Sequence, residues 1–199
     1  MRRPIVIGLT GSIGMGKSKV STKFRALGVP VFDADAAVRT VQGPGGAALP
    51  AIEATFPGTT GPEGLDRAAM RAVVLADPAA RRKLEAIVHP LVGKMRSRFL
   101  QANRSRRAVC LDVPLLLEGE GWRKCDIIAV VSAPFHVQRA RVLARPGMTD
   151  AQFHAIVDIQ MPDAEKRARA DVVIETGRGR LTTWRTVRRI ARFAQGNRF

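Results

Sequence analysis

Short apolar runs alternate with longer amphipathic stretches along the chain. The apolar runs are rich in β-branched residues, as buried parallel strands are. They are Ile5–Leu9, Val29–Phe32, Ala108–Val113, Asp126–Val131 and Val172–Ile174. Apolar residues at helical spacing predict helices after the first and the last run, over Lys17–Leu27 and Leu181–Phe193. Strands that alternate with helices predict an α/β fold with a five-stranded parallel sheet.

Residues 36–104 show no strand-like run. Glycine, proline and alanine are frequent at its start, and a short helix is expected over Leu49–Phe56. Asp66 is a typical N-cap for a helix that reaches Leu75. Another helix should start at Asp77-Pro78, break at His89-Pro90 and continue as a basic helix over Leu91–Ala102. This part of the chain is therefore predicted to be an all-helical insertion between two strands.

A glycine-rich segment follows the first predicted strand directly. Its sequence GSIGMGKS, from Gly11 to Ser18, is the full phosphate-binding loop pattern, and a predicted helix follows it. Glycines let the backbone bend around phosphates, while loop amides and the helix N-terminus attract the anion. We expect Lys17 to reach the β- and γ-phosphates and the Ser18 hydroxyl to bind Mg²⁺. The pattern predicts nucleotide binding, but it is shared by kinases, switches and motors.

Carboxylates follow two of the other predicted strands. Asp33 and Asp35 come after the second strand, on the sheet edge where ligands of parallel sheets bind. Asp33 is placed to orient an acceptor hydroxyl for phosphoryl transfer; the alternative is that Asp33 or Asp35 simply caps the following helix. The two roles are compatible if one aspartate is the cap and the other takes part in the chemistry. Asp112, after the third strand, is either a Mg²⁺-associated carboxylate or an ordinary residue at a strand end.

Arginines cluster in the segment after the fourth strand. A helix expected over Pro134–Ala144 carries Arg141, and Arg145 follows four residues later, which would put both on one helix face. Pro146-Gly147 should end this helix, and Thr149-Asp150 should start the next one. The arginines form either a solvated basic face or a lid that closes on the transferred phosphoryl group.

Composition excludes several classes of protein. The chain has 199 residues, a net charge of +16 and two cysteines, Cys110 and Cys125, which favour neither a disulfide framework nor a zinc site. No run is long enough for a transmembrane helix, no signal peptide is recognisable, and a cytoplasmic location is expected. The chain has no tyrosine and two tryptophans, which is unfavourable for a base-stacking surface. We attribute the positive charge to dispersed surface residues and to anionic small-molecule substrates.

Several motifs, in this order, make the sequence similar to the dephospho-CoA kinase family over nearly its whole length. They are Ile7-Gly8-Leu9-Thr10-Gly11, Asp33-Ala34-Asp35 with Arg39, Leu65-Asp66-Arg67, Ile87-Val88-His89-Pro90-Leu91, Asp112-Val113-Pro114-Leu115-Leu116, Gln138 with Arg141 and Arg145, Gln160-Met161-Pro162, Glu165-Lys166-Arg167, and Ala170-Asp171. The resemblance implies a P-loop kinase that transfers the γ-phosphoryl group of ATP to the ribose 3′-hydroxyl of dephospho-CoA. The products would be CoA and ADP, in the last step of coenzyme A biosynthesis.

The resemblance also implies roles for individual residues. The catalytic residues would be Lys17, Asp33 as the base, and Arg141. The ATP-binding residues would be Gly11, Ser12, Ile13, Gly14, Met15, Gly16, Lys17, Ser18, Lys19 and Arg145, with Ser18 also a ligand of Mg²⁺. The acceptor-binding residues would be Thr10, Asp33, Asp35, Arg39, His89, Pro90 and Leu115. Two positions depart from the family pattern: Lys19 replaces the usual threonine, and Pro146 replaces an acidic residue.

The resemblance further implies a division of the chain into three functional parts. The nucleotide-binding core would comprise about 1–35, 105–134 and 168–199, the acceptor-binding part about 36–104, and the lid about 135–167. ATP and dephospho-CoA would be the substrates, with no nucleic acid or membrane partner, and the protein would be a monomer. The alternative functions are another nucleoside or nucleotide kinase and, less favoured, a nucleic-acid-stimulated P-loop ATPase.

Overall fold

The computed structural model describes residues 3–196 and divides the chain into two compact units. One unit, called here the sheet unit, comprises Met1–Phe32 and Asn103–Phe199. The other, called here the helical unit, comprises Asp33–Ala102. The ends of the predicted core, 1–2 and 197–199, lie outside the described residues. No helix in the described part of the chain combines the length and the apolar character needed to cross a membrane.

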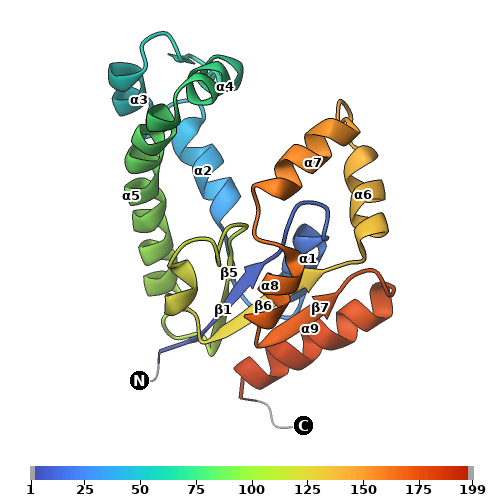
Figure 1. The fold of residues 1–199 in the computed structure, drawn as a ribbon. Coiled ribbons are helices and arrows are strands. Elements are labelled where there is room, and N and C mark those ends of the chain that lie inside the picture. Colours follow the sequence, from blue (N-terminus) through green and yellow to red (C-terminus); the bar gives the residue numbers. More distant parts are fainter. Residues whose placement is uncertain (1–2, 197–199) are drawn as a thin grey trace. The chain divides into compact units, whose positions relative to one another are not determined.

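The sheet unit is built on a five-stranded sheet with the strand order β2-β5-β1-β6-β7 (Figure 1). The strands are β1 (Ile5–Thr10), β2 (Val31–Asp33), β5 (Ala108–Asp112), β6 (Ile127–Ser132) and β7 (Val172–Glu175). The central strand β1 pairs in parallel with β5 and with β6, and β6 pairs in parallel with β7. The prediction of an α/β fold with a five-stranded parallel sheet is confirmed.

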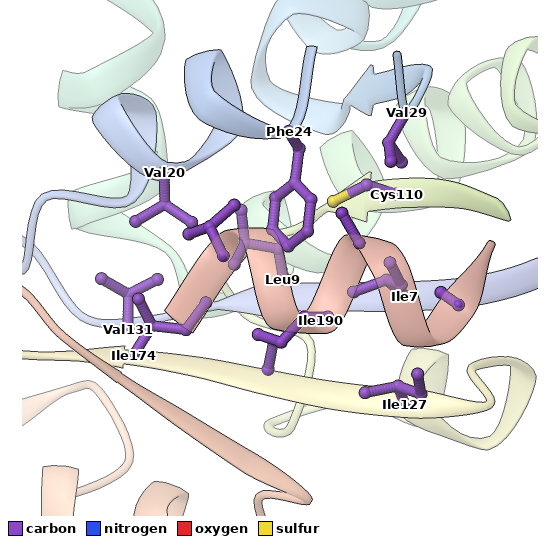
Figure 2. Close-up of a cluster of buried hydrophobic side chains, with 14 of the residues drawn as sticks. Ile7, Leu9, Val20, Phe24, Val29, Cys110, Ile127, Val131, Ile174 and Ile190 are labelled. Atoms are coloured by element: carbon purple, nitrogen blue, oxygen red, sulfur yellow. The ribbon is translucent and has the colours of Figure 1, made fainter. Parts of the chain in front are cut away.

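Helices α1 and α9 pack on one face of this sheet. Alternate residues of the central strands, among them Ile7 and Leu9, meet Val20 and Phe24 of α1 and Ile190 of α9 (Figure 2). The period of two along β1 explains why its odd-numbered residues enter this cluster together. The helices of the unit are α1 (Lys17–Ala26), the 3₁₀ turn η1 (Gly121–Lys124), α6 (Phe135–Leu143), α7 (Asp150–Asp158), α8 (Asp163–Ala168) and α9 (Arg180–Ala194).

The helical unit has its own apolar core. Its elements are α2 (Ala34–Gln42), α3 (Leu49–Thr55), β3 (Thr60–Gly61), β4 (Gly64–Leu65), α4 (Arg67–Ala76) and α5 (Pro78–Ala102). The long helix α5 packs against α2, α3 and α4. Val41, Ile52, Phe56, Met70 and Val88 form the centre of the cluster. The predicted N-cap Asp66 is confirmed, because its carboxylate accepts hydrogen bonds from the first-turn amides of α4.

Two predictions for the helical unit were wrong. The insertion is not all-helical, because β3 and β4 form a small antiparallel hairpin around Pro62-Glu63. The chain also does not break at Pro90, which lies inside the continuous helix α5. Proline removes one helical hydrogen bond, but Pro90 is exposed, and apolar residues on both sides of it pack on the same cluster. Packing therefore outweighs the local preference of proline.

Two predictions for the sheet unit were also wrong, and two short elements were not predicted. Helix α6 ends at Leu143, so Arg145 lies beyond it and does not share a helix face with Arg141. Helix α9 buries residues such as Val187 and Ile190, whereas Leu181, which was expected on the buried side, is 59% exposed. The elements η1 and α8 have only four and six residues, which is too short for their periodicity to be recognised.

Candidate functional site

The glycine-rich segment connects β1 to α1 and adopts a conformation that only glycine allows at two positions. Gly14 and Gly16 have φ angles of 76° and 91°, in the left-handed region. A Cβ atom on Gly14 would lie 2.6 Å from Val142 Cγ2 and 2.8 Å from the carbonyl oxygen of Gln138. Gly16 is the N-cap of α1 and has no side chain to bond the first amides of that helix. These amides are suited to bind an anion.

Lys17 is held at the start of α1 by a buried carboxylate. Its ammonium group forms an ion pair with Asp112 Oδ1, and the hydroxyl of Ser21 donates a hydrogen bond to Asp112 Oδ2. Asp112 is only 3% exposed, and a buried carboxylate is stable only when such partners compensate for its lost hydration. Asp112 was left undecided by the sequence and is absent from the predicted site residues. Its place at the end of β5, beside β1, is the signal that could have identified it.

Arg141 lies against the backbone of the same loop. Its guanidinium donates to Thr176 Oγ1 and to the Thr176 carbonyl oxygen, each at 2.9 Å, with longer contacts of 3.4 and 3.5 Å to the carbonyl oxygens of Gly14 and Met15. The Thr176 hydroxyl is also 2.6 Å from the Met15 carbonyl oxygen. Thr176 was not predicted, because nothing in the residues after the last strand distinguishes it. Arg145, in contrast, is exposed.

The other predicted loop residues differ in exposure. Ser18 and Lys19 are exposed in the first turn of α1, whereas Ser12 and Met15 are buried. Ile13 has both of its backbone groups hydrogen-bonded to glutamine side chains.

Thr10 and Leu115 were predicted to contact the acceptor, and both belong to the sheet unit. Thr10 is completely buried, and its hydroxyl donates to the Pro114 carbonyl oxygen at 2.8 Å. This bond links the end of β1 to the segment that follows β5. Leu115, the next residue along that segment, is 45% exposed.

The remaining predicted acceptor residues belong to the helical unit. Asp33 is the N-cap of α2, and its Oδ1 accepts a hydrogen bond of 2.9 Å from the Ala36 amide. The sequence left open which of the two aspartates is the cap; it is Asp33, and Asp35 lies in the first turn of that helix. Arg39 is exposed near the end of α2, and His89 and Pro90 are exposed in the middle of α5.

The donor chemistry near the loop suits a hard cation. Within residues 3–196 no group of three or more histidine, cysteine, aspartate or glutamate side chains could form a metal site. Mg²⁺ usually needs only one or two protein oxygens, together with phosphate oxygens and water. The Ser18 hydroxyl and the Asp112 carboxylate are oxygen donors of this kind, so the residues present fit the expected ion.

Comparison with protein families and known proteins gives one consistent result. The family model described as dephospho-CoA kinase matches residues 5–180. The chain is 59% identical to the dephospho-CoA kinase of Novosphingobium aromaticivorans over 177 residues, which cover 89% of this chain and 88% of the relative. It is 45% identical to the dephospho-CoA kinase of Zymomonas mobilis over 186 residues, which cover 94% of each chain.

Solved structures have the same fold. The crystal structure of a Thermus thermophilus protein superimposes with a TM-score of 0.84 and 34% identity, over 95% of this chain and 96% of that one. The dephospho-CoA kinase of Campylobacter jejuni superimposes with a TM-score of 0.71 over 97% of this chain and 98% of that one. Its identity is 20%, so this second similarity concerns the fold alone.

Proposed function

The chain belongs to the dephospho-CoA kinase family, and on that premise we propose how its residues transfer a phosphoryl group from ATP to dephospho-CoA. The activity of the family is the last step of coenzyme A biosynthesis. The observation that carries the residue assignments is the Lys17 ammonium, held by Asp112 at the N-terminus of α1, where the N-cap Gly16 provides no side-chain hydrogen bond. The substrates are ATP and dephospho-CoA, with transfer to the ribose 3′-hydroxyl.

Lys17 and the loop amides bind the β- and γ-phosphates. Phosphoryl transfer has a loose transition state, so the protein contributes mainly positioning and stabilisation of charge. The pairing with Asp112 supports this role, because it holds the flexible lysine side chain beside the loop. Arg141 contributes a second positive charge, and its contacts with the backbone of Gly14 and Met15 support a role beside the transferred group.

Asp33 orients the acceptor hydroxyl and receives its proton. The bond from the Ala36 amide engages one carboxylate oxygen, and a carboxylate can accept several hydrogen bonds. Asp33 also lies at the N-terminus of α2, as its N-cap. Thr10, Asp35, Arg39, His89, Pro90 and Leu115 complete the acceptor-binding set.

Ser18 would hold Mg²⁺ together with the phosphates, with the Asp112 carboxylate nearby. The bound ion supplies charge neutralisation on the phosphate oxygens. Arg145 and Lys19 contribute to ATP binding from the surface of the protein. The same proposal assigns acceptor binding to residues 36–104 and the role of a lid to residues 135–167. It also includes a monomeric state and a cytoplasmic location.

A coupled assay of ADP release over a panel of acceptors tests the function. Dephospho-CoA should stimulate ADP release strongly, whereas nucleosides, nucleoside monophosphates and RNA should leave it at the background rate. A nucleoside or nucleotide that is used more efficiently than dephospho-CoA would favour the alternative kinase. Stimulation by RNA or DNA would favour a nucleic-acid-dependent ATPase.

A further inference from the structure

The peptide groups of Ile13, in the middle of the phosphate-binding loop, are held by two glutamines from the segment 135–167. Gln138 Nε2 donates to the Ile13 carbonyl oxygen at 2.8 Å. Gln160 Oε1 accepts from the Ile13 amide at 3.1 Å. The two glutamines are 22 residues apart, since one lies on α6 and the other follows α7. Both belong to motifs of the sequence to which the proposed function gives no role.

The two contacts use opposite ends of the same type of side chain. A glutamine amide carries a donor NH₂ and an acceptor oxygen. Gln138 presents its donor to the carbonyl of Ile13, and Gln160 presents its acceptor to the amide. The N–H and the C=O of Ile13 belong to the two peptide groups on either side of its Cα atom, so neither of these peptide groups can rotate without breaking a hydrogen bond. The orientation of Ile13 in turn determines where the next amides of the loop point.

Gln138 is fixed by close packing of α6 against the loop. Its side chain is 3% exposed. A Cβ atom on Gly14 would lie only 2.8 Å from the Gln138 carbonyl oxygen, so α6 and the loop are too close for any residue but glycine at this position. Arg141, one turn further along α6, contacts the loop beyond Gly14. Helix α6 therefore holds the loop over three consecutive residues.

The residue after Gln160 is held by an ion pair in which the lysine is buried. Glu118 Oε1 accepts from the amide of Met161, the next residue, at 3.2 Å. The same oxygen lies 2.7 Å from Lys166 Nζ, and Lys166 is completely buried. The ammonium is not aligned for a hydrogen bond, so the attraction is ionic. A fully buried lysine is rare, and it requires such a partner to remain charged.

We propose that Gln138 and Gln160 are positioning residues that fix the two peptide groups flanking Ile13 and thereby align the loop amides for ATP, with the Glu118–Lys166 pair anchoring the segment at Gln160. The inference rests on the proposed function, because it assigns ATP to this loop. Segment 135–167 then acts on phosphate binding through the loop backbone, in addition to the charge of Arg141. An amide array that is already aligned binds the triphosphate without reorganisation.

Exchanging each glutamine for glutamate tests this directly. The structure predicts that the substitution breaks the hydrogen bond of Gln138 and preserves that of Gln160. In Gln160→Glu the carboxylate still accepts from the Ile13 amide. In Gln138→Glu two acceptors face each other, because a carboxylate cannot donate to the Ile13 carbonyl. Both variants add one negative charge next to the same residue, so a general repulsion of ATP affects both. Gln152→Glu, on the exposed capping box of α7, is the control for charge added elsewhere in the segment.

The measurement is the dissociation constant of Mg·ATP by isothermal titration calorimetry, without acceptor. We expect Gln138→Glu to bind ATP at least about 10-fold more weakly than Gln160→Glu, and Gln152→Glu to bind like the wild type, since an unpaired buried polar group weakens binding on this scale. Equal losses in Gln138→Glu and Gln160→Glu, no loss in either, or a larger loss in Gln160→Glu would overturn the proposal.

A second pair of variants covers the possibility that Gln138→Glu does not fold. Gln138→Met and Gln160→Met keep the side-chain length and remove the hydrogen bond, and their melting temperatures report folding. Each should bind ATP about 5- to 10-fold more weakly, and wild-type affinity in folded Gln138→Met would overturn the proposal. A wild-type protein that binds ATP but does not phosphorylate dephospho-CoA would contradict the proposed function and leave the role of the glutamines intact.

Discussion

Asp33 has two candidate roles that a suitable set of substitutions separates. It caps α2 through one hydrogen bond of 2.9 Å to the Ala36 amide, and it is the proposed base. Asparagine and serine cap helices about as well as aspartate, but neither can accept a proton at neutral pH. Alanine removes both functions. Asp33→Asn and Asp33→Ser therefore test the chemistry, and Asp33→Ala adds the structural effect.

The expected magnitudes differ enough to distinguish the roles. Loss of an N-cap costs about 1 kcal/mol, which lowers the Tm of a chain of this size by roughly 2–4 °C. Loss of a positioned acid or base lowers kcat by roughly 10²–10⁴-fold, or about 3–5 kcal/mol of transition-state stabilisation. We expect Asp33→Asn to have the Tm of the wild type and a kcat that is lower by this factor. Asp33→Ala should show the same loss of kcat together with the lower Tm.

Steady-state kinetics with saturating ATP and dephospho-CoA give kcat. Thermal melting gives the Tm, and calorimetry gives the dissociation constant of ATP. ATP affinity should remain near that of the wild type, because Asp33 serves the acceptor. Asp35→Asn, in the first turn of the same helix, is the matched control and should cost much less activity. A kcat of Asp33→Asn within twofold of the wild type, or an inactive Asp35→Asn enzyme, would refute the assignment of the base.

Three further predictions concern other parts of the molecule. Lys17→Ala should lose nearly all phosphoryl transfer in the coupled assay and should also lower the Tm, because the buried Asp112 carboxylate loses its ammonium partner; wild-type turnover would contradict the loop assignment. Hydrogen exchange should decrease over residues 135–167 when ATP and dephospho-CoA bind, and a change confined to the core would contradict the lid role. Burial alone would raise the pKa of Asp126, but hydrogen bonds from Arg3 and the Val6 amide lower it below its ordinary value. Arg3→Gln should therefore lower the Tm at about pH 7, and the difference from the wild type should shrink only as the pH falls through the lowered pKa of Asp126, because protonation removes the attraction. A difference that stays constant down to the acid limit of folding would contradict this.

The sheet could be predicted from the sequence because its signals are local. Apolar runs such as Ile5–Leu9 mark the buried strands, and the glycine pattern marks the turn from β1 into α1. Pro90 shows where local reasoning fails. Proline has no backbone N–H to donate, which favours a helix end. The apolar residues on both sides of Pro90 nevertheless pack on one cluster and keep α5 continuous. That cluster involves residues far apart in the sequence, so periodicity within one segment cannot reveal it.

The candidate site shows the same limit. Lys17 could be predicted from the glycine-rich motif, and Arg141 from the resemblance. Their partners could not: Asp112 lies at the end of β5, and Thr176 directly follows β7. The cap at Asp33 instead of Asp35 depends on where α2 begins, and a sequence pattern locates a helix start only to within a few residues. The contacts of residues 135–167 with the glycine-rich loop join parts of the chain that are far apart in the sequence, so they depend on the folded chain.

The position of the transferred phosphoryl group is the most direct test of the central claim. The protein is incubated with Mg·ATP and dephospho-CoA, and the product is examined by ³¹P and ¹H NMR, with Lys17→Ala as the control. The account predicts one new phosphate monoester on the ribose 3′-oxygen, formed in equal amount to ADP and absent with Lys17→Ala. A phosphoryl group on another position, or ADP formed without a phosphorylated acceptor, would contradict the account.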